Sequence, residues 1–120
     1  MATRSPIELR AHEGGEIVLE DGVVIEDGTS IEATSVVRIG ARARIGPFCK
    51  IIDNHFHLPV GHRLDRPESV PVTVGPDAIV GPHAVLLPGA EMGAGSLLGP
   101  AAVLSFKLPA GATFPGAIHA

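Results

Sequence analysis

The chain has 120 residues and a formal net charge of -4, so it fits one domain and lacks the basic surplus of a nucleic-acid-binding protein. Apolar residues make up 45% and aromatic residues only 3%, which requires a core of aliphatic and small side chains. With no apolar run near the roughly 18 residues of a membrane span and no signal peptide, we expect one cytoplasmic domain, residues 1–120, with neither membrane nor nucleic acid as partner.

A repeat of six residues begins early in the chain. Residues 1–16 carry no regular pattern, and we expect them to cap the fold or to form its edge. Aliphatic residues then recur in two runs, the second shifted by two positions: Leu19, Ile25, Ile31 and Val37, followed by Ile39, Ile45 and Ile51. The single cysteine, Cys49, falls four places after an anchor, where no residue larger than Val occurs, so we place it in the core.

The repeat stops after Ile51. Residues 57–73 are rich in Pro and Gly, and we expect them to form a loop excursion of a length that is uncommon unless it is functional. Three of the six histidines lie in or beside this segment: His55, His57 and His62. His55 also stands where every other hexad carries a small residue.

The repeat resumes with its most regular stretch, residues 74–107. The anchors here are Val74, Val80, Leu86, Met92, Leu98 and Leu104. Gly often follows an anchor, and we expect it to relieve strain at a bend. His83 lies on this regular stretch, and we expect it at the surface or at an interface between subunits.

A period of six predicts an all-β coil. A helix would repeat its apolar residues every 3.6 positions, and a meander of hairpins would alternate them strictly. Short strands joined by a bend every six residues explain both the aliphatic and the small positions, because each coil then buries its inner face against its neighbours.

Two segments resemble the hexapeptide-repeat acyltransferases, a family that includes the maltose, galactoside and O-antigen O-acetyltransferases. These segments read IGARARIGPFCKI and VGPDAIVGPHAVLLPGAEMGAGSLLGPAAVLS. The resemblance implies a left-handed parallel β-helix of hexapeptide repeats with three hexapeptides per turn. It also implies a homotrimer with active sites between subunits, acetyl-CoA as the acyl donor, and no metal.

The excursion and the hexad before it carry the residues that match the active site of these O-acetyltransferases. The resemblance places a catalytic base at His57, with Asp53 as a group that orients an imidazole and Arg66 as a substrate contact. Each has a structural alternative: His57 as an ordinary loop histidine, Asp53 as a turn-forming residue and Arg66 as a tie for the loop. His55 is a second candidate for the base, or a structural histidine where the coil opens.

Coenzyme contacts are expected on the regular coils, at Ala84, Ser96 and Lys107. Lys107 falls one residue later than the lysine of the family's usual Thr-Lys-Asp text. A further group of basic residues on successive coils forms either a solvated face or a patch for anionic substrate or coenzyme phosphates: Arg38, Arg42, Arg44 and Lys50.

The function that these residues favour is acyl transfer to a hydroxyl group of a sugar or similar small acceptor, with direct transfer assisted by a histidine base. One alternative is a zinc enzyme resembling gamma-class carbonic anhydrase, with His55, His57 and His83 as the possible ligands. The other is a trimeric scaffold without catalytic activity.

Overall fold

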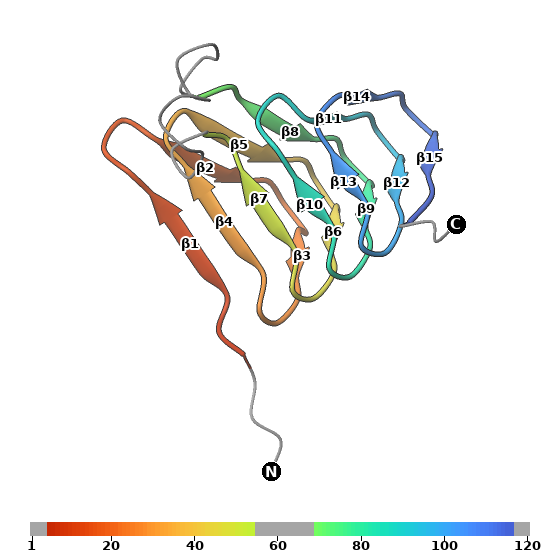
Figure 1. Ribbon diagram of the computed structural model, residues 1–120, viewed down its shortest axis with the longest axis horizontal. Helices are drawn as coiled ribbons and strands as arrows, with labels where there is room; N and C mark the ends of the chain where they lie inside the picture. The colour runs from red at the N-terminus through yellow and green to blue at the C-terminus, as the bar shows by residue number, and fades with distance from the viewer. Residues whose placement is uncertain (1–4, 55–68, 117–120) are drawn as a thin grey trace, which may run out of the picture.

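The computed structural model describes residues 5–54 and 69–116 as a three-sided coil of parallel strands (Figure 1). Sheet A contains β1 (Glu8–Ala11), β4 (Ser30–Ala33), β7 (Lys50–Ile52), β10 (Val85–Leu86) and β13 (Val103–Leu104) in that order. Sheet B contains β2 (Glu16–Leu19), β5 (Val36–Ile39), β8 (Val72–Val74), β11 (Glu91–Met92) and β14 (Lys107–Leu108). Sheet C contains β3 (Val24–Ile25), β6 (Arg44–Ile45), β9 (Ile79–Val80), β12 (Leu97–Leu98) and β15 (Thr113–Phe114).

The chain visits the three sheets in turn, so every third strand lies beside the strand one turn earlier. This arrangement confirms the predicted all-β parallel solenoid. No helix in residues 5–54 or 69–116 is long and apolar enough to cross a membrane.

The core consists of columns of inward-facing aliphatic side chains. In sheet A the register aligns Ile31 with Ile51, Ile51 with Leu86 and Leu86 with Leu104, and all four residues are fully buried. Small residues fill the space beside these columns, among them Cys49, which is 2% exposed as predicted. The one threonine among them, Thr29, is paired inside the core, since its hydroxyl donates to the carbonyl of Gly46 at 2.7 Å and accepts from the amide of Cys49 at 3.2 Å.

The shift of two positions between the first two aliphatic runs arises where the coil passes from sheet A to sheet B through two long strands. Strands β4 and β5 each have four residues, whereas most later strands have two. The passage from Ile31 to Ile39 therefore takes eight residues, and Val37 and Ile39 both face the core, paired with Val72 and Val74.

The reason we gave for the recurring glycines was wrong. Gly40 and Gly75 have no positive φ; instead, a Cβ at Gly40 would lie 2.6 Å from the nitrogen of Pro76, and one at Gly75 would lie 2.7 Å from the nitrogen of Ala94. These glycines let adjacent coils approach closely. The left-handed conformation occurs two residues later, and the non-glycine residues there are Arg42, Phe48, Asp77, His83 and Ala101.

Candidate functional site

One corner of the coil, where the chain passes from sheet A to sheet B between β7 and β8, opens into the excursion. Asn54 and Ser69 form an isolated antiparallel bridge, and the amide of Val70 donates to the carbonyl of Asp53 at 2.8 Å. The residues on either side of segment 55–68 therefore lie side by side at this corner. His55, His57, His62 and Arg66 lie outside the described residues, so their predicted roles stay predictions.

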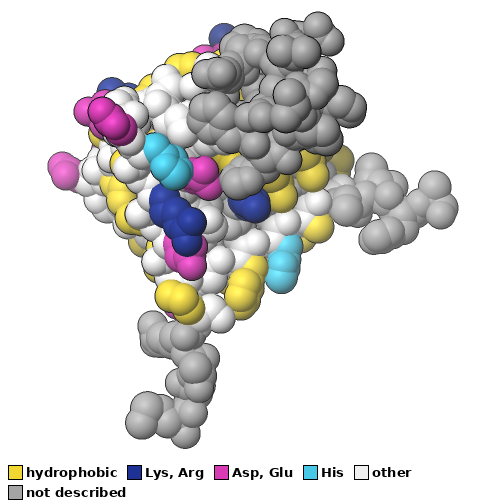
Figure 2. Space-filling model, turned by 60° about the vertical axis from the view of Figure 1, so that its left-hand side comes forward, with side chains coloured by type: hydrophobic (Ala, Val, Ile, Leu, Met, Phe, Trp, Pro, Cys, Tyr) yellow, Lys and Arg dark blue, Asp and Glu magenta, His cyan; other side chains and the backbone are white. Residues whose placement is uncertain are grey.

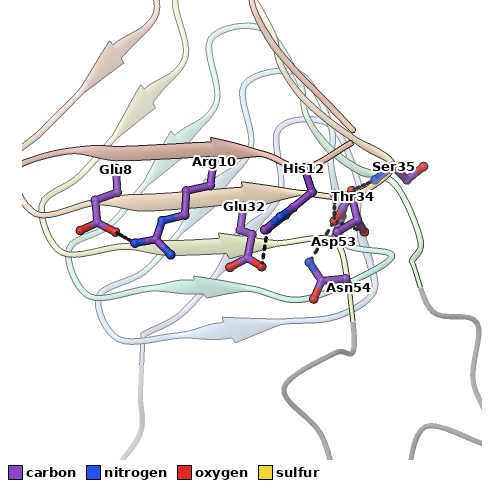
Figure 3. A network of polar contacts seen from close by, with 8 residues as sticks. All are labelled: Glu8, Arg10, His12, Glu32, Thr34, Ser35, Asp53 and Asn54. Carbon is purple, nitrogen blue, oxygen red and sulfur yellow. Dashed lines mark hydrogen bonds and ion pairs between the residues drawn. The ribbon is translucent and has the colours of Figure 1, made fainter. Parts of the chain in front are cut away.

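The face shown in Figure 2 brings histidine and charged side chains together. A histidine lies against an acidic side chain there, with basic side chains close to both. The acidic partner belongs to β4, and the residues involved are drawn in Figure 3. This polar group distinguishes the A–B corner from the regular, mainly apolar coils that follow it.

Asp53 is fully buried, and its carboxylate binds the A–B corner of the preceding turn (Figure 3). Its Oδ1 accepts from the amide of Thr34 at 2.8 Å and from the Thr34 hydroxyl at 3.2 Å, and its Oδ2 accepts from the amide of Ser35 at 2.8 Å. The side-chain amide of Asn54 adds a contact of 3.5 Å to Oδ1. These contacts give Asp53 a structural role at the corner, and its predicted action on an imidazole stays a prediction.

His12 and Glu32 form an imidazole–carboxylate pair at the same corner. The Nε2 of His12 lies 3.0 Å from the Oε2 of Glu32. The Glu32 side chain is only 17% exposed, whereas that of His12 is 49% exposed. In the register of sheet A, Glu32 aligns with Ile52, the residue directly before Asp53. The pair therefore lies next to the point where the excursion begins (Figure 3).

Sequence reasoning missed this pair because the first turn does not follow the hexapeptide period. Arg10 aligns with Glu32 across 22 residues, more than the 18 that separate Leu86 from Leu104 in the regular coils. The available signal was the presence of His12 among residues 1–16, a segment with no repeat from which a register could be read.

The predicted coenzyme contacts lie on different sides of the coil. Ala84 and Ser96 are fully buried, and the Ser96 hydroxyl donates to the carbonyl of Gly93 at 2.7 Å. A ligand on the surface would meet the more exposed residues that follow them, Val85 and Leu97. Lys107 is exposed on sheet B. This packing does not support side-chain contacts from Ala84 and Ser96, and the assignment stays a prediction.

The basic residues Arg38, Arg42, Arg44 and Lys50 do not form one patch, which corrects the view of them as a cluster. Arg38 projects from sheet B, Arg44 from sheet C and Lys50 from sheet A. Arg42 lies at the corner between sheets B and C, where it makes two hydrogen bonds, of 2.9 and 3.0 Å, to Asp77. This bidentate contact holds the pKa of the Asp77 carboxyl below its usual value.

His83 is exposed, as expected, at the corner between sheets C and A. Its ring stacks on Phe48 with centroids 5.5 Å apart and an angle of 10° between the planes. Within residues 5–54 and 69–116, no group of three or more His, Cys, Asp or Glu side chains is arranged to hold a metal ion.

No protein-family model and no curated protein matches the sequence. Solved structures do share the fold. A hexapeptide-repeat-containing acetyltransferase from Vibrio cholerae has a TM-score of 0.72 and 17% identity, over 92% of this chain and 66% of its own. PerB from Caulobacter crescentus, solved with CoA and GDP-perosamine, has a TM-score of 0.53 and 19% identity, over 92% of this chain and 55% of its own.

A third structure is a mutant of AntD, an N-acyltransferase from Bacillus cereus, in complex with dTDP-4-amino-4,6-dideoxyglucose and coenzyme A. It has a TM-score of 0.51 and 15% identity, over 92% of this chain and 73% of its own. At these identities the likeness establishes the fold. This chain spans less than two thirds of the length of the first two proteins.

Proposed function

We propose that this chain is a subunit of a coenzyme A-dependent acyltransferase whose acceptor binds at the A–B corner beside Asp53, His12 and Glu32. The observation that carries the proposal is the shared coil: three structures that match 92% of this chain are acyltransferases or hold coenzyme A. The corner where the coil is interrupted also gathers imidazole, carboxylate and amide groups, the side chains that acid–base chemistry uses.

The acceptor that we propose is a sugar carrying a free hydroxyl or amino group. The sequence resemblance favours a hydroxyl acceptor. The AntD complex holds a nucleotide-linked amino sugar, and that protein is an N-acyltransferase, which supports an amine as the second possibility.

The proposed transfer is direct, from thioester to acceptor. His57 takes the acceptor proton while the acceptor atom attacks the thioester carbonyl, and a backbone N–H stabilises the oxyanion. The new bond to the acyl carbon forms, the carbon–sulfur bond breaks, and the imidazolium returns the proton to the departing thiolate.

Cys49 is unsuited to carry the acyl group. Its thiol is buried and donates to the carbonyl of Gly81 at 3.1 Å. Burial raises the pKa of this thiol, which disfavours the nucleophilic thiolate. An acyl-enzyme intermediate on the chain's one cysteine is therefore not part of the proposal.

We propose a homotrimer that packs through sheet C. The outward-facing residues of this sheet align as Val24, Arg44, Ile79, Leu97 and Thr113. Val24, Ile79 and Leu97 are 41%, 43% and 38% exposed. The corresponding column of sheet B is mainly polar and consists of Val18, Arg38, Thr73, Glu91 and Lys107. An apolar stripe along a flat side of the coil suits a repeated contact between copies.

Thermal unfolding with added ligands tests the proposed function. A ligand that binds only the folded protein stabilises it by about 2.7 kcal/mol at a concentration 100 times its Kd. We expect acetyl-CoA and coenzyme A to raise the unfolding temperature and zinc to leave it unchanged. Stabilisation by zinc alone would favour the carbonic-anhydrase-like alternative, and no stabilisation by any of the three would favour the scaffold.

A further inference from the structure

We propose that two copies of this chain associate through the N-terminal ends of their coils, with β1 of one copy antiparallel to β1 of the other. The partner of the exposed edge of β1 is therefore a second copy of the same chain. This surface lies at the end of the coil and is separate from the apolar stripe along sheet C. The inference goes beyond the proposed function and does not depend on it.

The N-terminal end of the coil leaves one edge of each sheet without a neighbouring strand. β1, β2 and β3 are the first strands of sheets A, B and C, and no strand in the described part of the chain pairs with their outer edges (Figure 1). Leu9 and Leu19 align with the buried Ile31 and Ile39, yet they are 47% and 41% exposed. An unpaired strand edge with uncovered apolar side chains is a template for association.

The opposite end of the coil is covered. Leu104 and Leu108 lie on the last strands of sheets A and B, and they are 0% and 5% exposed. Phe114, on the last strand of sheet C, packs against the core, and its ring meets the ring of Phe106 with centroids 5.5 Å apart. A head-to-tail stack of coils therefore has no matching apolar end. Two N-terminal ends can meet around a two-fold axis, and such a contact closes after two copies.

The backbone of β1 offers free hydrogen-bonding groups at alternate residues. The amide of Glu8 donates to the carbonyl of Thr29 at 3.0 Å, so the backbone groups of Glu8 point toward β4. Because these groups alternate along a strand, those of Leu9 and Ala11 point away from β4. In a two-fold pair centred on Leu9, the two Leu9 residues exchange N–H···O bonds, and Ala11 lies opposite Ile7 of the second copy.

The charges on the outer face of β1 favour this register. When the pair is centred on Leu9, Glu8 of each copy lies opposite Arg10 of the other. The registers one step to either side place Glu8 opposite Glu8 or Arg10 opposite Arg10. Opposite charges directly across two strands stabilise the pairing, and like charges oppose it. In the single chain these two side chains form an ion pair of 3.3 Å and are 50% and 64% exposed, so both are accessible to a second copy (Figure 3).

The proposed contact is small. β1 and β2 contribute four residues each and β3 contributes two. Interfaces at the low end of the size range belong to weak and transient complexes, so we expect pairing between about 100 μM and about 1 mM and not at micromolar concentration.

Sedimentation equilibrium of the full chain tests the pairing. Between about 10 μM and about 1 mM at low salt, the mass of the wild-type particle should double. Leu9→Glu places a carboxylate at the centre of the contact and should abolish the doubling, because burial of an unpaired charge is unfavourable. Val103→Glu makes a similar change at an exposed position of sheet A near the other end of the coil, and it should leave the doubling intact.

An exchange of charges tests the register and uses exposed positions alone. Glu8→Arg and Arg10→Glu each place like charges opposite one another, so neither variant should double its mass by itself. An equimolar mixture of the two variants should associate, because each chain then faces charges opposite to its own. A role of these side chains within one chain would give no such rescue on mixing. Circular dichroism checks that each variant keeps the wild-type fold.

Four results would overturn the inference. The first is a wild-type mass that stays constant up to about 1 mM, and the second is growth beyond a doubling, which indicates open-ended stacking. The third is a folded Leu9→Glu variant that doubles its mass as the wild type does. The fourth is a mixture of folded Glu8→Arg and Arg10→Glu chains that stays unassociated at concentrations where the wild type pairs.

Discussion

Asp53 shows how a single buried side chain fixes the corner on which the candidate site is built. Its carboxylate accepts the amides of Thr34 and Ser35, which would otherwise be unpaired where the coil turns from sheet A to sheet B. The sequence could show that an Asp precedes the excursion. It could not show which backbone groups the Asp would bind, because they lie one turn earlier, between the four-residue strands β4 and β5.

Substitution of Asp53 by Asn tests this structural role. The Asn side chain places an NH2 group against a backbone amide, so one buried donor loses its acceptor, at a cost of about 1–3 kcal/mol. Asp77→Asn is the matched control, since the pair with Arg42 is exposed and contributes little to stability. Urea unfolding measures both variants. Equal losses would show that the Asp53 contacts do not support the corner.

The loss of stability in Asp77→Asn should also depend on pH. Arg42 lowers the pKa of Asp77 in the folded protein. A group with a depressed folded pKa contributes stability above its unfolded pKa and loses it as the pH falls through the folded pKa. The small loss in Asp77→Asn should therefore be present at neutral pH and disappear in acid. A loss that persists in acid would assign it to a cause other than the ion pair.

Among the strands and corners, the six-residue period was enough to predict which side chains face the core. It was not enough to predict the structure of the corners. Burial of Ile31, Ile51, Leu86 and Leu104 could be predicted because each hexad buries one aliphatic side chain. The longer strands β4 and β5 could not be predicted, because a change of phase in the sequence does not identify the strands that contain the additional residues. For the same reason, the strand register that brings His12 to Glu32 could not be predicted from the sequence.

Replacement by glycine should change the stability of the protein in opposite directions at two corner alanines. Ala101 has a φ of 59°, and a left-handed alanine costs about 1–2 kcal/mol relative to glycine. Glycine adds freedom to the unfolded chain worth about 0.4–1 kcal/mol. Ala101→Gly should therefore stabilise the protein by about 0.5–1 kcal/mol, whereas Ala94→Gly, at a corner position without positive φ, should destabilise it. Urea unfolding gives both signs, and destabilisation by Ala101→Gly would contradict the corner geometry.

On the scale of the whole molecule, the three sides of the coil differ in what they expose. Sheet C carries the apolar stripe and sheet B a mainly polar column, whereas sheet A has polar residues near the candidate site and exposes Val85 and Val103 on its later turns. The sequence showed a surplus of apolar residues but could not assign them to one side. That assignment needs the register, which places Ile79 directly beside Leu97 and separates it from Val24 by Arg44.

The proposed trimer has a direct test. Light scattering should give a mass near three times 12.3 kDa. Ile79→Glu places a charge in the stripe and should yield monomers, because burial of an unpaired carboxylate is unfavourable. Thr73→Glu makes the same change on the outer face of sheet B and should remain trimeric. A wild-type monomer at micromolar concentration would refute the trimer, as would dissociation by Thr73→Glu alone.

The proposed function requires base-assisted acyl transfer at the A–B corner. The most direct test is release of coenzyme A from acetyl-CoA in the presence of an amino-sugar or sugar acceptor, compared between the wild type, His57→Ala and His55→Ala. Since a general base contributes about 10²–10⁴-fold, we predict that His57→Ala lowers kcat at least 100-fold while coenzyme binding is nearly unchanged, and that His55→Ala costs much less. A wild-type activity that neither substitution affects, in variants of unchanged assembly, would place the chemistry elsewhere and contradict the proposed function.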